Sequence, residues 1–559
     1  KKNRMATRSP QKKKASTKYI FVVGGVMSGV GKGVATSSIG LILQSKGYAV
    51  TALKIDPYIN VDAGTMNPTE HGEVFVLRDG YETDQDMGNY ERFMGLELSR
   101  DHYMTTGLVY KTVIEKERNL EYGGRCVEVV PHIPQEVIRR IKKAVRTSKA
   151  DIAIIEIGGT VGEYQNILFL EAARIMKLEH PNDVFSVLVS YLPIPSKIGE
   201  MKTKPTQYAV RTLNSTGIQP DFIIARSDRP LDEKRKEKLA VNCSIRKEDV
   251  ISAPDVESIY DVPLNFEQDH LGDRFLKKLG LKAKKRDNLS VWEKRVMRNR
   301  KSTETVRIGV VGKYFKTGDY VFSDAYISVI EALKHAACEV GRKIELDWID
   351  SADFETDPKR LESLRQYQGI LVPGGFGGRG IEGIVSAIRF CREEKVPYFG
   401  LCYGMQLMVI EYARSVMKLA DAHTKEVNGT TNHPVIDILP EQVEKLRKKN
   451  FGATMRLGQY PAMLKSGSIA REAYKSDAIL ERHRHRYEVN PEYIGQIEAA
   501  GLIFSATSPD GVLMEIAELP KKQHPFFLGT QFHPEFQSSL IAPHPLFVAF
   551  LRAAVKEGK

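Results

Sequence analysis

The chain has 559 residues, of which 42% are hydrophobic and 27% are charged, and these are ordinary values for folded domains. Its length exceeds what one hydrophobic core supports, so we expect at least two domains. The longest apolar runs are far shorter than the roughly 20 residues that a membrane span requires, and no hydrophobic secretory signal opens the sequence. We therefore expect no membrane partner.

The distribution of charge and of cysteines bears on possible partners, on metal sites and on the cellular compartment. The net charge is +12, but residues 1–18 contribute +8 of it, so the rest of the chain carries only the difference, +4. We interpret residues 1–18 as a disordered basic extension, and we expect no nucleic-acid partner. The five cysteines are scattered without a Cys-x-x-Cys pair, which excludes a disulfide framework or a zinc site and indicates a reducing, cytoplasmic compartment.

Short β-rich runs alternate with helical patterns along most of the chain. Near-continuous Val and Ile runs of this kind predict a doubly wound α/β domain with a parallel sheet over residues 19–281. The charge-dense stretch 282–303 predicts a linker, and a second α/β domain follows over residues 304–559. The predicted strands are residues 19–23, 49–55, 152–157, 184–191, 222–225, 306–311, 369–372 and 396–399.

Residues 24–33 form a glycine-rich loop between the first predicted strand and a helical pattern over 34–46. Glycines let backbone N–H groups surround phosphates, and Lys32 can reach the β and γ oxygens. The spacing is one residue longer than in the standard P-loop, and Gly33 replaces the hydroxyl residue that usually ligates Mg²⁺. A dinucleotide loop would leave Lys32 without a role, so we predict a nucleoside triphosphate site, with a purely structural glycine turn as the alternative.

Carboxylates elsewhere in the chain must then hold the metal. Asp84 and Asp86 are two residues apart, so in an extended segment they would share a face. Glu156 lies in the apolar run 152–157, at the strand end where parallel folds bind ligands. Mg²⁺ typically takes one or two carboxylates together with phosphate oxygens and water. We predict Asp86 and Glu156 as Mg²⁺ ligands, with plain surface acids as the alternative.

The C-terminal half contains a thiol version of the nucleophile elbow. A predicted strand enters Gly-Leu-Cys-Tyr-Gly at residues 400–404, and this turn points Cys402 at a helix N-terminus, where the thiolate is favoured. His533 can serve as its base, and Glu535, two residues further on, can orient the imidazole. The three predict acyl transfer, with oxyanion donors from the glycine-rich loop 373–380. A small buried cysteine is the alternative.

His483 and His485 lie in the run Arg-His-Arg-His-Arg and resemble a metal-binding pair. The neighbouring arginines would repel a cation. We therefore interpret this run as an anion-facing lid.

Taken together, these motifs resemble those of known enzyme families. The Gly-x-Cys-x-Gly turn, the late His-Pro-Glu and the earlier Pro-Gly-Gly loop resemble class I glutamine amidotransferases. The motifs at residues 54–62, 71–73, 82–84, 156–162 and 202–207 resemble those of CTP synthetases. This resemblance extends over roughly residues 19–557 and implies an N-terminal synthetase domain and a C-terminal glutamine amidotransferase domain.

The resemblance also assigns ligands to individual positions. It implies Cys402, His533 and Glu535 as the catalytic residues and Asp86 and Glu156 as the metal ligands. ATP would contact Gly29, Val30, Gly31, Lys32, Gly33, Lys54 and Asp86. UTP, or the inhibitor CTP, would contact Ser28, Glu163, Tyr164, Gln165, Lys202, Thr203, Lys204, Pro205, Thr206, Gln207 and Lys238. L-Glutamine would contact Gly375, Tyr403, Gly404, Met405, Gln406, Glu426 and Arg486.

The implied reaction uses two sites. ATP phosphorylates O4 of UTP, and ammonia released from glutamine at Cys402 displaces the phosphate to give CTP. The resemblance further implies Mg²⁺, activation by GTP with Arg379 as a candidate contact, inhibition by CTP, a homotetramer with the UTP site at subunit contacts, and filament formation.

One segment departs from the family pattern. Where relatives often carry Gly-Asp-Ile-Glu, this chain has Gly-Glu-Tyr-Gln at residues 162–165, so Gln165 replaces a carboxylate near the pyrimidine nucleotide. We expect weaker feedback by CTP. Two other functions compete with the CTP synthetase assignment. A cofactor-ring amidase would not need the motif at 202–207, and a partition-type ATPase would not need Cys402, His533 and Glu535.

Overall fold

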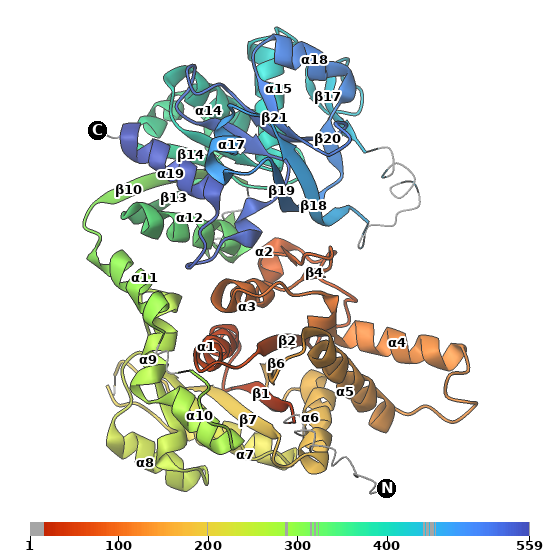
Figure 1. Ribbon diagram of the computed structural model, residues 1–559, viewed down its shortest axis with the longest axis vertical. Coiled ribbons are helices and arrows are strands. Elements are labelled where there is room, and N and C mark those ends of the chain that lie inside the picture. The colour runs from red at the N-terminus through yellow and green to blue at the C-terminus, as the bar shows by residue number, and fades with distance from the viewer. Residues whose placement is uncertain are drawn as a thin grey trace, which may run out of the picture. The chain divides into compact units, whose positions relative to one another are not determined.

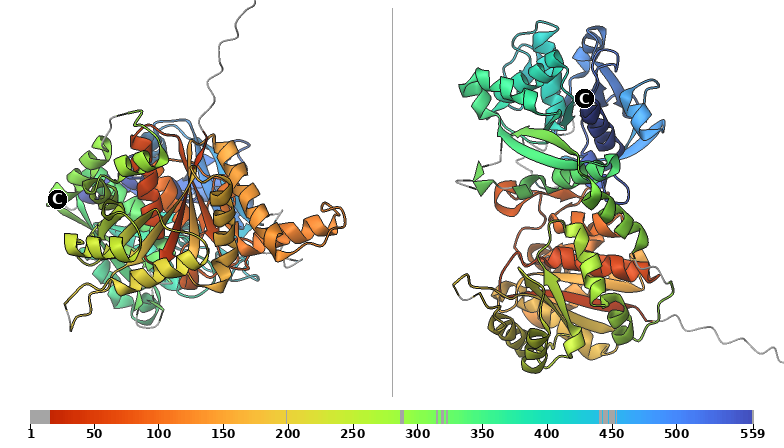
Figure 2. Two further views of the ribbon diagram at one scale, coloured as in Figure 1. Left: turned by 90° about the horizontal axis from the view of Figure 1, so that it is seen from below. Right: turned by 90° about the vertical axis from the view of Figure 1, so that its left-hand side faces the viewer.

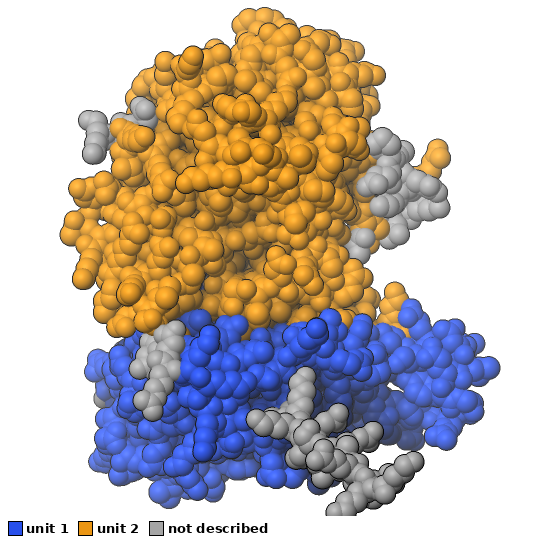
Figure 3. Space-filling model, in the orientation of Figure 1, with its two compact units in different colours: residues 1–57, 112–288 blue, residues 58–111, 289–559 orange. Residues whose placement is uncertain are grey.

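The computed structural model describes residues 16–557 except 198, 286–288, 314–315, 318–319, 322, 440–441, 443–446, 448–451 and 453. Residues 1–15, most of the predicted basic extension, lie outside this part. Two compact units, coloured separately in Figure 3, comprise residues 1–57 with 112–288 and residues 58–111 with 289–559. Residues 58–111, which we expected in the N-terminal domain, thus belong to the second unit. Among the described helices, none is long and apolar enough to cross a membrane.

Unit 1 is built on a parallel sheet in the order β2-β6-β1-β7-β8-β9. Helix α1 packs with α9 and α10, whereas α5 packs with α6, and the strands lie between these helices (Figures 1 and 2). The predicted α/β domain with a parallel sheet is confirmed. The strands are β1 (Lys18–Gly25), β2 (Val50–Asp56), β6 (Ile152–Thr160), β7 (Val184–Tyr191), β8 (Phe222–Ser227) and β9 (Val250–Pro254). The helices are α1 (Lys32–Ser45), α5 (Val129–Ser148), α6 (Ile167–Glu179), α7 (Lys204–Ser215), α8 (Glu233–Asn242), α9 (Val262–Gln268) and α10 (Leu271–Leu279), while α4 (Thr106–Arg118) spans the boundary between the units.

Unit 2 contains a nine-stranded sheet in the order β13-β10-β14-β15-β23-β22-β21-β18-β19. The first five strands are parallel, and the last four continue the sheet with antiparallel pairing. Its strands are β10 (Thr305–Gly312), β13 (Lys343–Asp350), β14 (Gly369–Val372), β15 (Tyr398–Leu401), β18 (Arg456–Leu464), β19 (Ala478–His485), β21 (Ile503–Thr507), β22 (Met514–Glu518) and β23 (Phe527–Thr530). Shorter strands are β3 (Phe75–Val76), β4 (Glu82–Thr83), β5 (Tyr103–Thr105), β11 (Lys316–Thr317), β12 (Tyr320–Val321), β16 (His423–Thr424), β17 (Pro434–Ile438) and β20 (Tyr487–Val489).

The helices of unit 2 include one from the predicted linker. Helix α11 (Ser290–Lys301) buries Trp292 and Val296, so this charge-dense stretch packs as an amphipathic helix. The others are α2 (Pro68–His71), α3 (Asp86–Met94), α12 (Ile327–Val340), α13 (Ala352–Thr356), α14 (Ile381–Glu394), α15 (Tyr403–Ser415), α17 (Ile469–Tyr474), α18 (Pro491–Ala499) and α19 (Pro545–Glu557), with 3₁₀ turns η5 (Ser323–Tyr326) and η7 (Pro534–Gln537) near the site.

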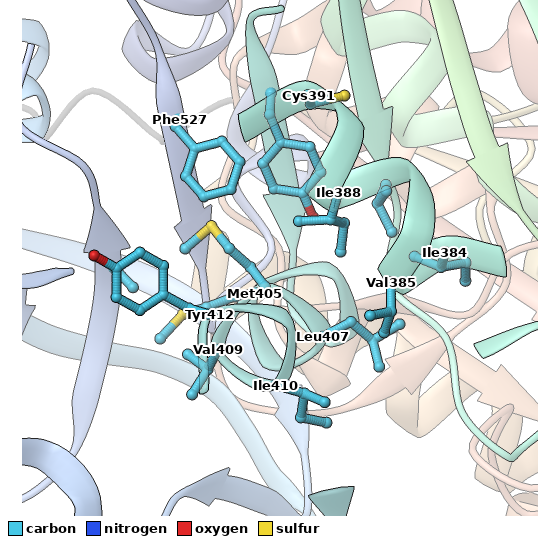
Figure 4. Packing of buried hydrophobic residues seen from close by; sticks show 14 of the residues in the cluster. Ile384, Val385, Ile388, Cys391, Met405, Leu407, Val409, Ile410, Tyr412 and Phe527 are labelled. Atoms are coloured by element: carbon cyan, nitrogen blue, oxygen red, sulfur yellow. The ribbon is translucent and has the colours of Figure 1, made fainter. Parts of the chain in front are cut away.

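The large sheet of unit 2 carries a hydrophobic core on each face. Tyr398 packs in the core formed with α14 and α15, whereas the next residue, Phe399, packs in the core formed with α12 and α19. Successive side chains of a strand point to opposite faces, so one short strand serves both cores. Figure 4 shows the first core, where Met405 of α15 lies against Phe527 of β23.

A buried ion pair joins the two helices of this core, and it generates a stability prediction. Arg392 of α14 donates two hydrogen bonds, of 2.9 and 2.8 Å, to the carboxylate of Glu411 on α15, which is fully buried. We expect Arg392→Ala to lower the free energy of unfolding by about 3 kcal/mol or more, because it leaves a buried charge without its partner. Urea denaturation followed by tryptophan fluorescence measures this change, since Trp292 and Trp348 both lie in unit 2.

The control is Arg389→Ala on the same helix. Arg389 pairs with Glu393 on the exposed face, and such pairs contribute little. Equal midpoints for the two variants would contradict the prediction.

Candidate active site

The phosphate-loop sequence of unit 1 has the expected setting between β1 and α1. Gly29 and Gly31 adopt φ of +68° and +87°, which other residues reach only with strain. Lys32 begins the helix, and its Nζ donates a hydrogen bond of 3.0 Å to the carbonyl oxygen of Gly159. Backbone N–H groups at such a helix start bind phosphate. The residues predicted for ATP on this turn are Gly29, Val30, Gly31, Lys32 and Gly33.

Lys54 and Glu156 stand opposite each other on β2 and β6. Their Nζ and Oε1 atoms are 2.7 Å apart, and both side chains are buried. Asp56 lies two residues further along β2, with Oδ1 at 3.7 Å from the same Nζ. Its buried Oδ2 has no hydrogen-bond partner among the described residues. Asp56 is therefore a further candidate ligand, and the sequence analysis missed it.

Asp84 and Asp86 do not alternate along a strand as expected. The backbone N–H of Asp86 donates a hydrogen bond of 2.9 Å to Asp84 Oδ1, where α3 begins. The expectation of a shared strand face was wrong because the chain turns into a helix at this point. Asp86 belongs to unit 2 and Glu156 to unit 1, so their pairing as metal ligands stays a prediction.

The segment predicted to bind UTP or CTP is partly buried. Thr206 hydrogen-bonds Ser190 at 2.8 Å, and Gln207 donates to Thr203 at 3.1 Å, so these buried side chains hold the start of α7 in place. Other residues predicted to contact UTP or CTP are more accessible. Lys202 is half-buried and pairs with Glu200, whereas Lys204 on α7 and Lys238 on α8 are exposed.

Residues 162–165, the segment that departs from the family pattern, are held by local hydrogen bonds. Gln165 donates a hydrogen bond of 2.6 Å to Glu163 Oε2, and the backbone N–H of Thr160 donates to Glu163 Oε1 at 3.0 Å. Tyr164 between them is 97% exposed. The amide of Gln165 thus pairs with a carboxylate in a place where a second carboxylate would be repelled.

A cavity of about 380 Å³ adjoins the phosphate loop in unit 1. Its walls include Gly31, Val34 and Ile224, with Arg226 held by Asp255 at 2.5 Å. Apolar walls with a few polar groups are typical of a site for a planar base. This cavity could not be predicted from the sequence, because apart from the phosphate loop and the start of α1 its walls come from β8, β9, α9 and adjoining residues, which carry no motif.

Cys402 lies in a sharp turn between β15 and α15. Its φ of +49° and ψ of −94° are unusual for a residue with a side chain. The glycines on both sides are required, because a Cβ on Gly400 would lie 2.7 Å from the carbonyl carbon of Gly404, and one on Gly404 would lie 2.5 Å from the oxygen of Val372. The turn is therefore the strained elbow that the sequence predicted.

His533 and Glu535 form an ion pair next to this elbow. The Nδ1 of His533 is 2.7 Å from Glu535 Oε1. Burial disfavours the charged imidazole, but the charges of Glu535 and Cys402 outweigh burial and raise the pKa of His533 to about 10. The thiol of Cys402 accepts a 3.6 Å hydrogen bond from Gln531 Nε2. The three predicted residues thus lie together.

A cavity of about 760 Å³ opens beside Cys402, wholly within unit 2. Its walls include one acid and one base suited to the two ends of an amino acid, Glu426 and Arg486. Met405 is buried in the core, and Gly404 packs against Val372, so only their backbone atoms can face a ligand. The predicted glutamine residues that line this cavity are Gly375, Tyr403, Gln406, Glu426 and Arg486.

The glycine-rich loop lies over the elbow. A Cβ on Gly374 would approach His533 Cε1 to 2.8 Å and Cys402 Cβ to 3.8 Å. Gly377 is fixed from two sides, because its N–H donates to Glu426 at 2.9 Å and its carbonyl accepts from Tyr403 Oη at 2.8 Å. The loop is thus held against the thiol, where its backbone N–H groups can act as oxyanion donors.

The histidine pair does not form a lid. His483 and His485 are buried and hydrogen-bond each other at 3.0 Å. Burial and the nearby Arg456 hold their pKa values well below the usual range. Only His485 of the two lines the 760 Å³ cavity. The pair is a neutral internal support, whereas Arg484 and Arg486 of the same run line the cavity.

Comparisons with known proteins identify the family of this chain. Residues 18–281 match the family model of the CTP synthase N-terminus, and residues 321–553 match that of class-I glutamine amidotransferases. The CTP synthase of Methanococcoides burtonii is 50% identical over 97% of this chain and 99% of its own length. That of Pyrococcus furiosus is 50% identical over 96% and 98%. The CTPS glutaminase domain of Trypanosoma brucei is 36% identical over 45% of this chain and 94% of that domain, with a TM-score of 0.41.

The two full-length relatives match 96–97% of the chain, and both are named CTP synthases. This agreement removes the cofactor-ring amidase and the partition ATPase as alternatives. The chain belongs to the CTP synthase family.

Proposed function

We propose that Cys402, His533 and Glu535 carry out the glutaminase half of the family reaction, in which UTP is converted to CTP with ammonia from glutamine. The single observation that supports this assignment most is the His533–Glu535 ion pair beside the strained thiol. Glu426 and Arg486 bind the amino and carboxylate groups of glutamine. The side-chain amide then lies at Cys402.

The chemistry of this half follows from the proton positions. The Cys402 thiolate attacks the amide carbon, and the loop at residues 374–377 stabilises the oxyanion. The His533 imidazolium gives its proton to the leaving nitrogen, so ammonia departs and a thioester remains. His533 then takes a proton from water, which attacks the thioester and releases glutamate. Glu535 keeps the ring oriented in both steps.

The synthetase half uses ATP, which is a substrate throughout the family. Gly29 to Gly33 and Lys32 hold its phosphates, and the cavity beside Arg226 receives the base. Lys54 and Lys32 place positive charge near the transferred phosphoryl group. The phosphoryl group moves to O4 of UTP, and ammonia then displaces phosphate from C4. UTP lies along residues 202–207, with Ser28 and Lys238.

Mg²⁺ fits the carboxylates beside this loop. Asp56 ends β2, and Glu156 lies on the adjacent strand β6, within β6 and not at its end as predicted. The Oδ2 of Asp56, which has no hydrogen-bond partner among the described residues, is an oxygen that a cation could bind. Asp86 remains our third candidate. When bound, the metal neutralises phosphate charge.

The proposal also includes regulation by nucleotides and assembly into a homotetramer. GTP activation and CTP inhibition are features of the family, and we assign the GTP contact to Arg379, whose side chain is 73% exposed in the glycine-rich loop. Tyr164 and Tyr208 are exposed aromatic side chains near the UTP segment, and they support a homotetramer with the nucleotide site at subunit contacts. Filament formation and a cytoplasmic location complete the proposal.

The first test separates the two halves. We expect Cys402→Ala to abolish CTP formation with glutamine and to retain it with added ammonia, because only ammonia release needs the thiol. Cys126→Ala, at an exposed cysteine of unit 1, is the matched control and should retain both activities. Loss of ammonia-dependent synthesis in Cys402→Ala would show that the thiol serves more than the glutaminase.

The second test concerns the pKa of His533. Glu535→Gln removes the charge that raises this pKa, so the imidazolium should lose its proton well below pH 10. Glutamine hydrolysis should fall roughly 10²-fold or more, and the alkaline limb of its pH profile should move to lower pH. Ammonia-dependent CTP formation should stay the same. An unshifted alkaline limb would refute the role of Glu535.

The third test concerns feedback. Gln165→Glu places a carboxylate beside Glu163 and restores the family pattern. We expect the CTP concentration for half-inhibition to fall severalfold. Glu163→Gln with Gln165→Glu is the matched control, because it exchanges the two groups and keeps the net charge. Unchanged inhibition in Gln165→Glu would contradict the expectation.

A further inference from the structure

A second, smaller cavity of about 110 Å³ adjoins the glutaminase residues in unit 2. It has room for a few molecules the size of water or ammonia. Cys402, His533 and Glu535 line one side of it. Residues from the N-terminal half of the sequence, Asn67 to Val74, line the other, and Glu73 is the acid among them.

Glu73 is held firmly in this wall. Its Oε1 accepts a hydrogen bond of 3.2 Å from the backbone N–H of Ser328, and its Oε2 accepts a short one from the Ser328 hydroxyl. Arg92 of α3 donates to the same hydroxyl at 3.0 Å, so its charge reaches Glu73 through a serine and not directly. A buried carboxylate without a contacting cation is costly to keep charged.

The surroundings make this carboxyl ready to take a proton near neutral pH. Burial, together with the negative charge of Glu535, raises its pKa to about 7 against the lowering effects of Ser328 and Arg92. The other titratable or charged groups around the cavity are Tyr326, Cys402, Arg484 and His533.

We propose that Glu73 is the proton acceptor that keeps ammonia uncharged after its release from glutamine. The inference rests on the proposed glutaminase role of Cys402. Ammonia that gains a proton in the cavity has lost its lone pair and cannot attack the activated UTP. An N–H bond of ammonium breaks, an O–H bond forms on Glu73, and neutral ammonia remains. The proton later returns to water, which restores the carboxylate.

Two features of the cavity favour this transfer over an ion pair. Neutral partners are cheaper than two charges in a buried space. Protonation of Glu73 also removes its repulsion with Glu535, which must stay charged to orient His533. A carboxylate placed here only to fix residues 58–111 in position would need neither a cavity nor a second acid nearby.

The experiment measures CTP formed per glutamate released between about pH 6.5 and about pH 9. Glu73→Gln keeps the shape and an oxygen acceptor for Ser328 but cannot take the proton. We expect its ratio to fall severalfold at neutral pH and to recover towards the wild-type value near the upper limit, where a much larger fraction of ammonia is uncharged without a base. Added ammonia at high pH should support normal synthesis.

Ser328→Ala is the matched control, because it removes the hydroxyl that contacts both Glu73 and Arg92 and keeps the carboxylate of Glu73. Loss of the hydroxyl raises the pKa of Glu73, but the carboxylate can still take the proton, so the deficit at neutral pH should be much smaller than that of Glu73→Gln. The proposal is overturned if Glu73→Gln shows no deficit, if its deficit is the same at all pH values, or if Ser328→Ala reproduces it. A wild-type chain that makes no CTP from either nitrogen source would instead overturn the proposed function.

Discussion

The position of the Cys402 thiol depends on how closely helix α15 approaches the sheet beneath it. A Cβ on Gly529 of β23 would lie 2.8 Å from that of Met405 on α15, and Gly400 and Gly404 permit equally close contacts at the elbow. This close approach requires a strained backbone conformation at Cys402, whose φ is positive. Such strain costs about 1–3 kcal/mol and persists only where the surroundings fix it. Here the buried face of α15 fixes it, because nearly every residue of this helix packs in the core.

The second constraint is the placement of residues 58–111. Buried ion pairs attach this segment to the large sheet of unit 2, since Arg482 donates to Glu91 at 2.7 Å and Arg484 donates to Glu82 at 2.9 Å. Ion pairs of this kind add little net stability, but a mismatched placement would leave a charge buried alone. They therefore specify where the segment lies. As a result, a stretch of the N-terminal half supplies one wall of the glutaminase cavity, including Glu73.

This placement also explains what the sequence could and could not predict. Strand positions and the elbow at Cys402 were predictable, because hydrophobic runs and glycine spacing are local signals. Residues 71–73 and 82–84 looked like parts of a nucleotide domain, and no local pattern shows that they pack on the other unit. Asp56 and the cavity at Arg226 depend on strand register. The arginine neighbours of His483 suggested an anion-facing run, whereas in β19 the charged side chains have buried partners.

Glu73 and Glu535 line the same cavity, and the groups that each contacts suit it to a different role. Glu535 contacts an imidazole and helps raise the pKa of His533 to about 10, so the ring stays protonated at neutral pH. Among the described residues Glu73 accepts hydrogen bonds from the hydroxyl and the N–H group of Ser328, and its pKa of about 7 divides it between two forms at the same pH. In the proposed glutaminase reaction, one group would thus supply a proton where the amide bond breaks, and another would take one up where ammonia leaves. Environments that separate pKa values in this way assign the acid and the base of a site. The segment that brings Glu73 to this place is therefore as much a part of the glutaminase as the elbow itself.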